Sequence, residues 1–243
     1  MTNLLANRWG IRSWPGRSLS LSLLLSAGMA LAQYSPSGTF DLGVGFGQTA
    51  LSSSILQGTL ELPLKSGKTT VPPAYRPDPR LAVTFSEARL ALFRQTLADQ
   101  ALKGKSQQEK QSFVAHLKDN DLVNGLWVFN AFDQRSPGLP ELVATYLGGM
   151  WKQVSGRSPD PAKLDILRSQ LQRSMLQPAH FSRIKAMSAD QRLDWMFGLS
   201  YDHDALAQDG LFNNDQTSRQ QRARLALESS RGNGFDLNGL DLK

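Results

Sequence analysis

The sequence contains no cysteine, and only three of its 243 residues are histidines. The absence of cysteine excludes disulfide bonds, thiolate metal sites, a cysteine nucleophile and a lipid-modified N-terminal cysteine. Hydrophobic residues make up 40% of the chain and charged residues 20%, which is typical of a globular protein. We therefore expect a fold that is held together by the burial of apolar side chains.

Acidic residues are also missing from the start of the chain. Residues 1–32 carry three arginines, then a leucine-rich apolar run, and they close with Ala30-Leu31-Ala32. This small-x-small ending precedes signal-peptidase cleavage. A membrane anchor is the alternative, but a span needs about 20 apolar residues and this run is shorter. We predict a secretory signal peptide, a mature chain that starts at Gln33, and export to the periplasm or the extracellular space.

The charge of the mature chain is small once the signal peptide is removed. It keeps 24 basic and 21 acidic residues, a net charge of +3, so the high pI of the whole chain belongs partly to the export signal. This excess does not indicate nucleic-acid binding. After signal cleavage the sequence also predicts no transmembrane span.

Residues 33–80 differ in composition from the rest of the chain. They contain six glycines, six prolines and eleven serines or threonines, without a helical pattern of apolar residues. The alternation over residues 40–46 has the period of a strand, but the glycines within it weaken that pattern. We predict a low-complexity, mostly disordered leader that contains at most one marginal hairpin.

Apolar residues recur with helical spacing from residue 84 onward. Capping-box patterns that begin at Thr84, Ser106 and Ser188 mark helix starts, and Asp160-Pro161 marks another. Residues 181–187 are interpreted as a short turn. These patterns predict an all-α domain over residues 81–231, built as a single multi-helix bundle or orthogonal array of six or seven helices.

The predicted core follows the apolar faces of three helices. It consists of Trp127, Phe129, Tyr146, Leu147, Met150, Trp151, Leu167 and Leu171. Gly148 and Gly149 lie inside one of these faces, and we interpret them as a close approach of a neighbouring helix rather than a hinge. Gly232 and Gly234 predict that residues 232–243 form a flexible tail.

The histidines offer little for catalysis or metal binding. His116, His180 and His203 do not fall into a metal-binding spacing. Asp202-His203-Asp204 is the most suggestive cluster, but consecutive helical residues point about 100° apart and cannot easily converge on one ion. We interpret this cluster as a solvated helix face and predict no metal, cofactor or catalytic residue from local motifs.

The last predicted helix is basic. Arg219 and Arg222 share one of its faces, and Arg224 lies beside that face. These three arginines are candidate contacts for an anionic lipid or polysaccharide. The helix lacks the bulky apolar face of a membrane-surface helix, so a solvated final helix is the favoured interpretation.

The order of several packing patterns resembles a known family. The patterns are Leu142-x3-Tyr146-x4-Trp151-x4-Gly156, then Ile166-Leu167-Arg168-x-Gln170-Leu171, then Ser188-x-x-Gln191. Over residues 82–210 the chain is similar to exported bacterial helical proteins that are defined as a domain of unknown function. Gly148-Gly149 departs from the acidic and alanine-rich runs of that family. The resemblance implies a helical fold, and it assigns neither an activity nor a functional residue to this chain.

Three functions remain open at this point. The absence of a catalytic motif favours a non-catalytic binding or interaction module of the bacterial cell envelope, whose partner is an envelope protein or polymer. A hydrolase of envelope polymers with dispersed carboxylates is an alternative, because carboxylate pairs leave no local signature. A module that docks on an anionic membrane or polymer through the basic C-terminal helix is another.

Overall fold

The computed structural model describes residues 75–131, 137–212 and 214–243. Within these residues the protein has eight α-helices, two short 3-10 helices and no β-strand, which confirms the predicted all-α class. In chain order the elements are η1 (Pro79–Leu81), α4 (Glu87–Ala101), α5 (Gln107–Asp119), α6 (Gly125–Ala131), α7 (Leu139–Ser155), α8 (Pro161–Met175), α9 (Pro178–Ala186), α10 (Ala189–Phe212), α11 (Gln216–Gly232) and η2 (Leu237–Gly239).

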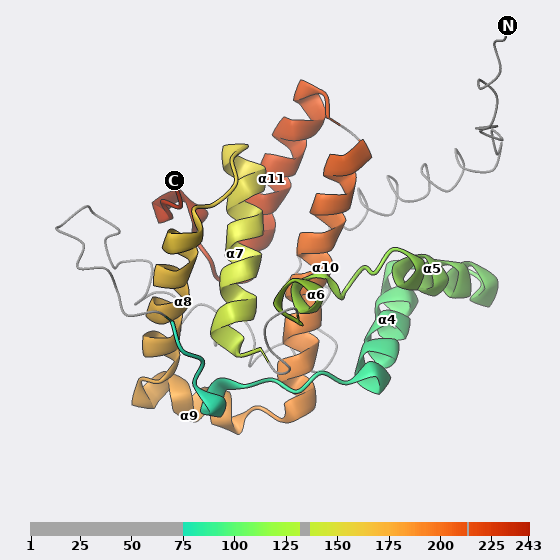
Figure 1. The fold of residues 1–243 in the computed structure, drawn as a ribbon. Helices are drawn as coiled ribbons and strands as arrows, with labels where there is room; N and C mark the ends of the chain where they lie inside the picture. Colours follow the sequence, from blue (N-terminus) through green and yellow to red (C-terminus); the bar gives the residue numbers. More distant parts are fainter. Residues whose placement is uncertain (1–74, 132–136, 213) are drawn as a thin grey trace, which may run out of the picture.

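The helices are arranged around α7. This helix packs against α6, α8, α10 and α11, and most of its residues are buried. A helix that is apolar on most sides belongs in the interior, and Pro140 fits its first turn because that position needs no backbone N–H. Figure 1 shows α8 on one side of α7 and α10 with α11 on the other, while α4 and α5 form a hairpin beyond α10.

Most of the predicted helix starts are correct. Ser106 and Glu109 form the complete capping box of α5, and Ser188 and Gln191 exchange two hydrogen bonds of 2.8 and 3.1 Å at the start of α10. Thr84 is not a cap. Ser86 takes that role in α4 and accepts the backbone N–H of Arg89 at 3.2 Å. The serine two positions later satisfies the same need for an acceptor at the helix start.

The predicted turn over residues 181–187 is wrong, because residues 181–186 belong to α9 and Met187 is its C-cap residue. Pro178 stands at the first position of the helix, where its fixed φ favours helical geometry. Phe181 and Ile184 lie one turn apart, and Ile184 is 1% exposed. This helix, which the sequence analysis did not predict, is short but has an apolar side that packs on the core.

The described side chains of the predicted core are buried. Trp127 and Trp151 are each 5% exposed, Leu167 is 2% exposed, and the remaining ones, Tyr146, Leu147, Met150 and Leu171, are completely buried. The side chain of Phe129 lies outside the described residues. Trp127 also packs edge-on against Phe85, with 5.2 Å between the ring centroids, so an aromatic cluster joins α6 to the segment before α4.

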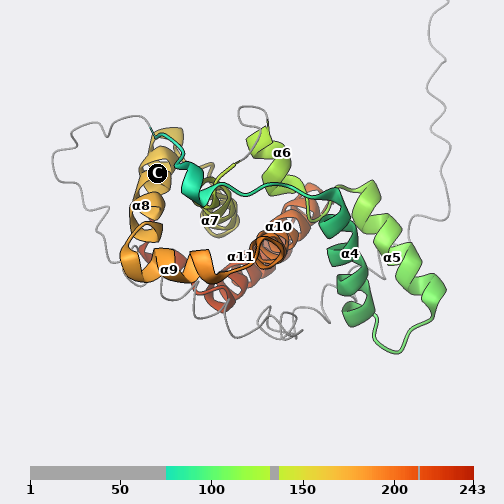
Figure 2. The same cartoon turned by 90° about the horizontal axis from the view of Figure 1, so that it is seen from below.

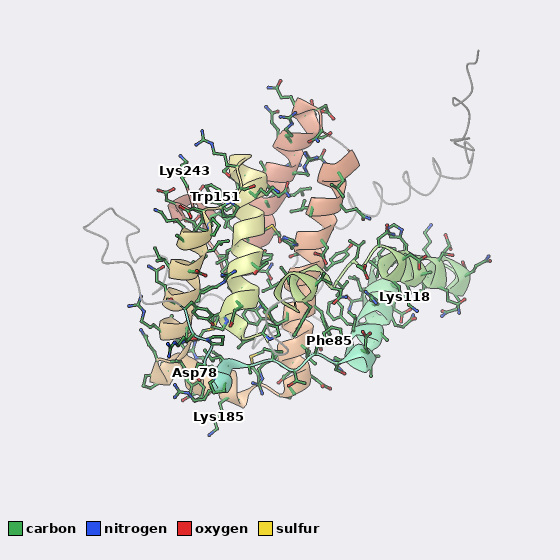
Figure 3. The ribbon with its side chains drawn as sticks, in the orientation of Figure 1. Asp78, Phe85, Lys118, Trp151, Lys185 and Lys243 are labelled. Carbon is green, nitrogen blue, oxygen red and sulfur yellow. The ribbon has the colours of Figure 1, made fainter. Side chains whose placement is uncertain are left out.

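The C-terminal segment, residues 233–243, is packed on the bundle and is not the flexible tail that the sequence predicted. The side chains of Phe235, Leu237, Leu240 and Leu242 are buried in the core. The indole N–H of Trp151 donates to the carbonyl of Leu240 at 3.0 Å. Figure 3 shows Trp151 and the final residue, Lys243, at the same end of the bundle. The glycines at the end of α11 redirect the chain back onto the core rather than freeing it, because apolar side chains follow them.

The predicted leader ends earlier than residue 80. Residues 75–85, which we call the strap, cross one end of the bundle from α8 to α4 (Figure 2). Gln172 of α8 accepts the N–H of Asp78 at 3.2 Å and donates to the carbonyl of Arg76 at 3.1 Å. Leu81 and Val83 are buried. The rest of the predicted leader, residues 33–74, and the predicted signal peptide lie outside the described residues.

In the part of the chain that the structure describes, no helix combines the length and the apolar character that crossing a membrane requires.

Candidate functional site

The middle of α10 concentrates the polar side chains of the interior. Because α10 packs against α4, α6, α7 and α11, consecutive residues on it face different neighbours. The interpretation of Asp202-His203-Asp204 as a solvated face is wrong: the side chains of His203 and Asp204 are 13% and 9% exposed, and Asp202 is partly buried. These three residues therefore lie at helix interfaces.

Asp204 holds the start of α6 from a different helix. Its Oδ2 accepts the backbone N–H of Gly125 at 2.8 Å and the hydroxyl of Ser200 at 3.1 Å. The Ser200 hydroxyl in turn accepts the N–H of Leu126 at 3.3 Å. The first N–H groups of a helix lack partners within the helix, so these two side chains of α10 supply the cap for α6. Gly125 is required here, because a Cβ atom would lie 2.0 Å from the carboxylate.

The turn that precedes α6 is strained and fastened from the other side. Asp121 and Val123 have positive φ values of 52° and 75°, and a β-branched residue rarely adopts this conformation. Arg94 of α4 donates to the carbonyl of Leu122 at 3.0 and 3.3 Å. Burial lowers the pKa of Arg94 from its usual value, and the nearby carboxylates of α4, the turn and α10 oppose that shift. The buried guanidinium thus fixes the turn that precedes α6, and this turn places the first residue of α6 within hydrogen-bond distance of Asp204.

His203 occupies space that a glycine of α7 leaves open. Its Nδ1 lies 3.0 Å from Oδ1 of Asp204, which orients the ring. A Cβ atom on Gly149 would fall 2.2 Å from Cδ2 of this imidazole, and one on Gly148 would fall 2.9 Å from Cδ2 of Leu164. The interpretation of the two glycines as a close approach of neighbouring helices is confirmed.

Asp202 belongs to a second polar network, between α7, α10 and α11. Its Oδ2 accepts the hydroxyl of Ser229 at 2.7 Å and the side-chain amide of Asn233 at 3.0 Å. The hydroxyl of Tyr146 lies 3.1 Å from that of Ser229, and the Asn233 amide also reaches Tyr146 at 3.2 Å. Ser229 and Asn233 thus bond to one oxygen of Asp202, and Tyr146 joins the network through these two residues.

Burial dominates the electrostatics of this second network. It raises the pKa of Asp202 to about 6, although the hydrogen bonds from Ser229 and Asn233 favour the ionised carboxylate and oppose the shift. Burial and the Asp202 carboxylate together raise the pKa of Tyr146 above its usual value, so this phenol stays neutral. Asp202 is the one carboxyl group of the network, and a pKa of about 6 means that its charge changes near pH 6.

The hydroxyl groups of these two networks are poorly accessible to a substrate, which limits the chemistry that they can perform. Ser229 beside Asp202 has the arrangement of a hydroxyl beside a base, and the pKa of about 6 suits proton transfer. However, Ser229 is 8% exposed, and Ser200 and Tyr146 are completely buried. Each of these hydroxyls is also hydrogen-bonded to another side chain of its network. The networks thus hold helices together and do not present a nucleophile at the surface.

The basic residues of α11 do not form one free patch. Arg222 is buried and binds Asp209 of α10 at 2.9 Å. Arg219 donates to the carbonyl of Asn214 at 2.8 Å, and Arg224 lies 3.6 Å from Glu228 on its own helix. Of the three candidate anion contacts, Arg219 and Arg224 are at the surface, and Arg222 instead joins α11 to α10.

Among the described residues, no group of three or more histidine, aspartate or glutamate side chains lies close enough together to hold a metal ion.

Sequence reasoning found part of this site. It singled out the acidic and histidine residues of α10 and placed Tyr146 in the core. It did not indicate that Ser200, Ser229 and Asn233 take part, or that the Tyr146 hydroxyl joins their network. A weak signal was available, because Ser200 precedes Asp204 by four residues and Ser229 precedes Asn233 by four, a spacing that places side chains on one helix face. Nothing local indicates that these faces meet Asp202 or the start of α6.

A comparison of the chain with protein-family models, with curated proteins and with solved structures finds no match. The resemblance to an exported family of unknown function therefore stays a prediction.

Proposed function

We propose that this protein is a non-catalytic binding module of the bacterial cell envelope. One observation carries the proposal: the side chains best suited to chemistry are hydrogen-bonded to each other inside the helix interfaces. Catalysis needs a nucleophile or base within reach of a substrate, and the serine hydroxyls are buried. Such a domain acts through the surface that its helices present.

The location in the envelope rests on the sequence. The pattern of residues 1–32 is that of a signal peptide, and a mature net charge of +3 favours neither nucleic acid nor a strongly anionic partner. The projecting hairpin of α4 and α5 suits an interaction protein, because α5 packs mainly on α4 and leaves many polar side chains exposed (Figure 1). The partner is an envelope protein or polymer.

A hydrolase of envelope polymers is the second candidate, and Asp202 is the observation that favours it. Its pKa of about 6 and its short distance to the Ser229 hydroxyl are properties of a general base beside a nucleophile. In this alternative a movement of α11 uncovers Ser229 to the substrate.

The experiment compares turnover by three purified proteins. Mature wild type, Asp202→Asn and Ser229→Ala are incubated with peptidoglycan fragments and other envelope polymers, and products are measured by mass spectrometry. We expect product at the level of the buffer for all three. Turnover by the wild type that disappears in either folded variant would establish the hydrolase and end the proposal. The intact mass of the exported protein, expected to start at Gln33, tests the predicted processing.

A further inference from the structure

The C-terminal segment, residues 233–243, is attached to the bundle by an apolar and a polar anchor. The apolar anchor consists of its buried side chains and of the bond between Trp151 and the carbonyl of Leu240. The polar anchor is Asn233, the C-cap residue of α11, from which the segment begins. Its amide contacts Asp202, Tyr146 and the carbonyl of Ser229, at 3.0, 3.2 and 3.0 Å. Asn233 thus joins the start of the segment to both α7 and α10.

The Asp202 carboxylate lacks a cationic partner in the described part of the chain. On α7 the titratable group that faces it is the Tyr146 phenol. On α11 its neighbours are the uncharged Ser229 and Asn233, since Arg222 binds Asp209 two turns further along α10. A partly buried carboxylate without a compensating charge is costly to ionise.

The remaining elements around α10 direct their charges elsewhere. Arg89 of α4 pairs with Asp190 and Asp194, and Arg94 binds the carbonyl of Leu122. The start of α6 faces Asp204 with backbone N–H groups. On α10 itself, Tyr201 stays neutral because burial and Asp202 raise its pKa, and His203 is directed to Asp204.

We propose that Asp202 is a proton-controlled anchor of the C-terminal segment. When Asp202 is neutral, Asn233 and residues 235–242 stay docked on α7 and α11. When Asp202 is ionised, the uncompensated charge favours an open state in which the carboxylate meets water and the segment leaves α7. Opening uncovers Tyr146 and Trp151, the α7 side chains that contact Phe235 and Leu240. This device does not depend on whether the domain binds a partner.

The sign of the pH dependence follows from the direction of the pKa shift. The pKa of Asp202 is about 6 in the closed state and near 3.8 when the carboxyl group is in water. The closed state therefore holds the proton more tightly, and its advantage is complete below the lower value. It is lost progressively as pH rises between these two values, and little further change occurs above pH 6.

Amide hydrogen exchange of the full mature chain measures this opening. Exchange rates for residues 233–243, corrected for the intrinsic effect of pH, are compared at pH 5 and pH 7.5. For a shift of about two pKa units we expect opening to be about tenfold more frequent at pH 7.5. Asp202→Asn, which cannot ionise, should remove this difference. Asp190→Asn, an exposed carboxylate on the same helix, should leave it unchanged.

A second measurement uses the wild type alone, in case the Asp202→Asn variant does not fold. The carboxyl carbon of Asp202 and the indole resonance of Trp151 are followed by NMR over the same pH range. We expect one common midpoint near pH 6 for the two signals. A flat exchange profile in the wild type, an unchanged pH effect in Asp202→Asn, or a Trp151 signal that does not follow Asp202 would each overturn the proposal.

Discussion

At the scale of single residues, the two neighbouring glycines of α7 have different roles. Gly149 faces the ring of His203, which is held in place by its bond to Asp204, while Gly148 faces the end of the flexible Leu164 side chain. A rigid, oriented ring cannot move aside as easily as a leucine methyl group. A Cβ atom is therefore harder to accommodate at residue 149 than at residue 148.

We expect Gly149→Ala to lower the free energy of unfolding by about 1–2 kcal/mol. Overpacking of this kind costs about 1–3 kcal/mol, and the better helix propensity of alanine returns about 1 kcal/mol. Gly148→Ala should cost less, because Leu164 can rotate. Urea unfolding curves of the two variants measure the difference.

The matched control is the same change in a His203→Ala background. Without the imidazole the alanine at residue 149 meets open space, so Gly149→Ala should become neutral or stabilising by up to about 1 kcal/mol. An equal loss of stability in the two backgrounds would show that His203 is not the obstacle.

At the scale of elements, the C-terminal segment behaves as part of the core although it has almost no regular structure. Its apolar residues alternate with polar ones around the short η2 turn, which Asp236 caps by accepting the N–H of Asn238 at 3.0 Å. The carbonyl of Leu242 accepts the N–H of Asp160, at the start of α8, at 2.8 Å. The segment thereby joins α7, α8 and α11.

Truncation after Gly234 should lower the free energy of unfolding by about 3–5 kcal/mol. Each lost apolar side chain contributes about 1.5–3 kcal/mol, and the chain entropy recovered by the removed residues offsets part of the total. Leu242→Ala alone should cost about 2–4 kcal/mol. Asp241→Ala, an exposed neighbour, should change stability by about 0.5 kcal/mol or less. Equal free energies of unfolding for the truncated and full chains would show that the segment is the flexible tail that the sequence predicted.

At the scale of the whole molecule, the strap and the C-terminal segment add apolar side chains to the core that the helices build. The strap brings Leu81 and Val83 into the core and packs Phe85 against both Trp127 and Phe197, with centroid distances of 5.2 and 6.1 Å. Figure 2 shows this segment running from α8 across to α4. The domain therefore begins before its first long helix.

Two shortened chains test this boundary. A chain that starts at Tyr75 keeps the strap and should melt close to the mature protein. A chain that starts at Ser86 loses three apolar side chains, worth about 3–5 kcal/mol together, and its Tm should fall by about 10 °C. Calorimetry of both chains gives the comparison. Equal Tm values for the two shortened chains would contradict a structural role of the strap.

Local patterns in the sequence predicted the elements well where one short stretch contains all the information. The capping box at Ser106 works through residues three positions apart, and the apolar face of α7 repeats with the helical period. Such signals do not depend on the rest of the fold. The short α9 was missed because one apolar turn resembles a loop.

By itself the sequence determined that the described domain is helical, where most of its helices begin, and which side chains, such as Trp151 and Leu171, supply the core. Only the tertiary structure decided that Asp202 meets Asn233 across two helices, that Asp204 caps α6, and that the C-terminal segment packs on α7. The physical reason is distance along the chain. Helix formation depends on neighbours within one or two turns, whereas burial of a charge or a tail depends on residues 30 to 90 positions away.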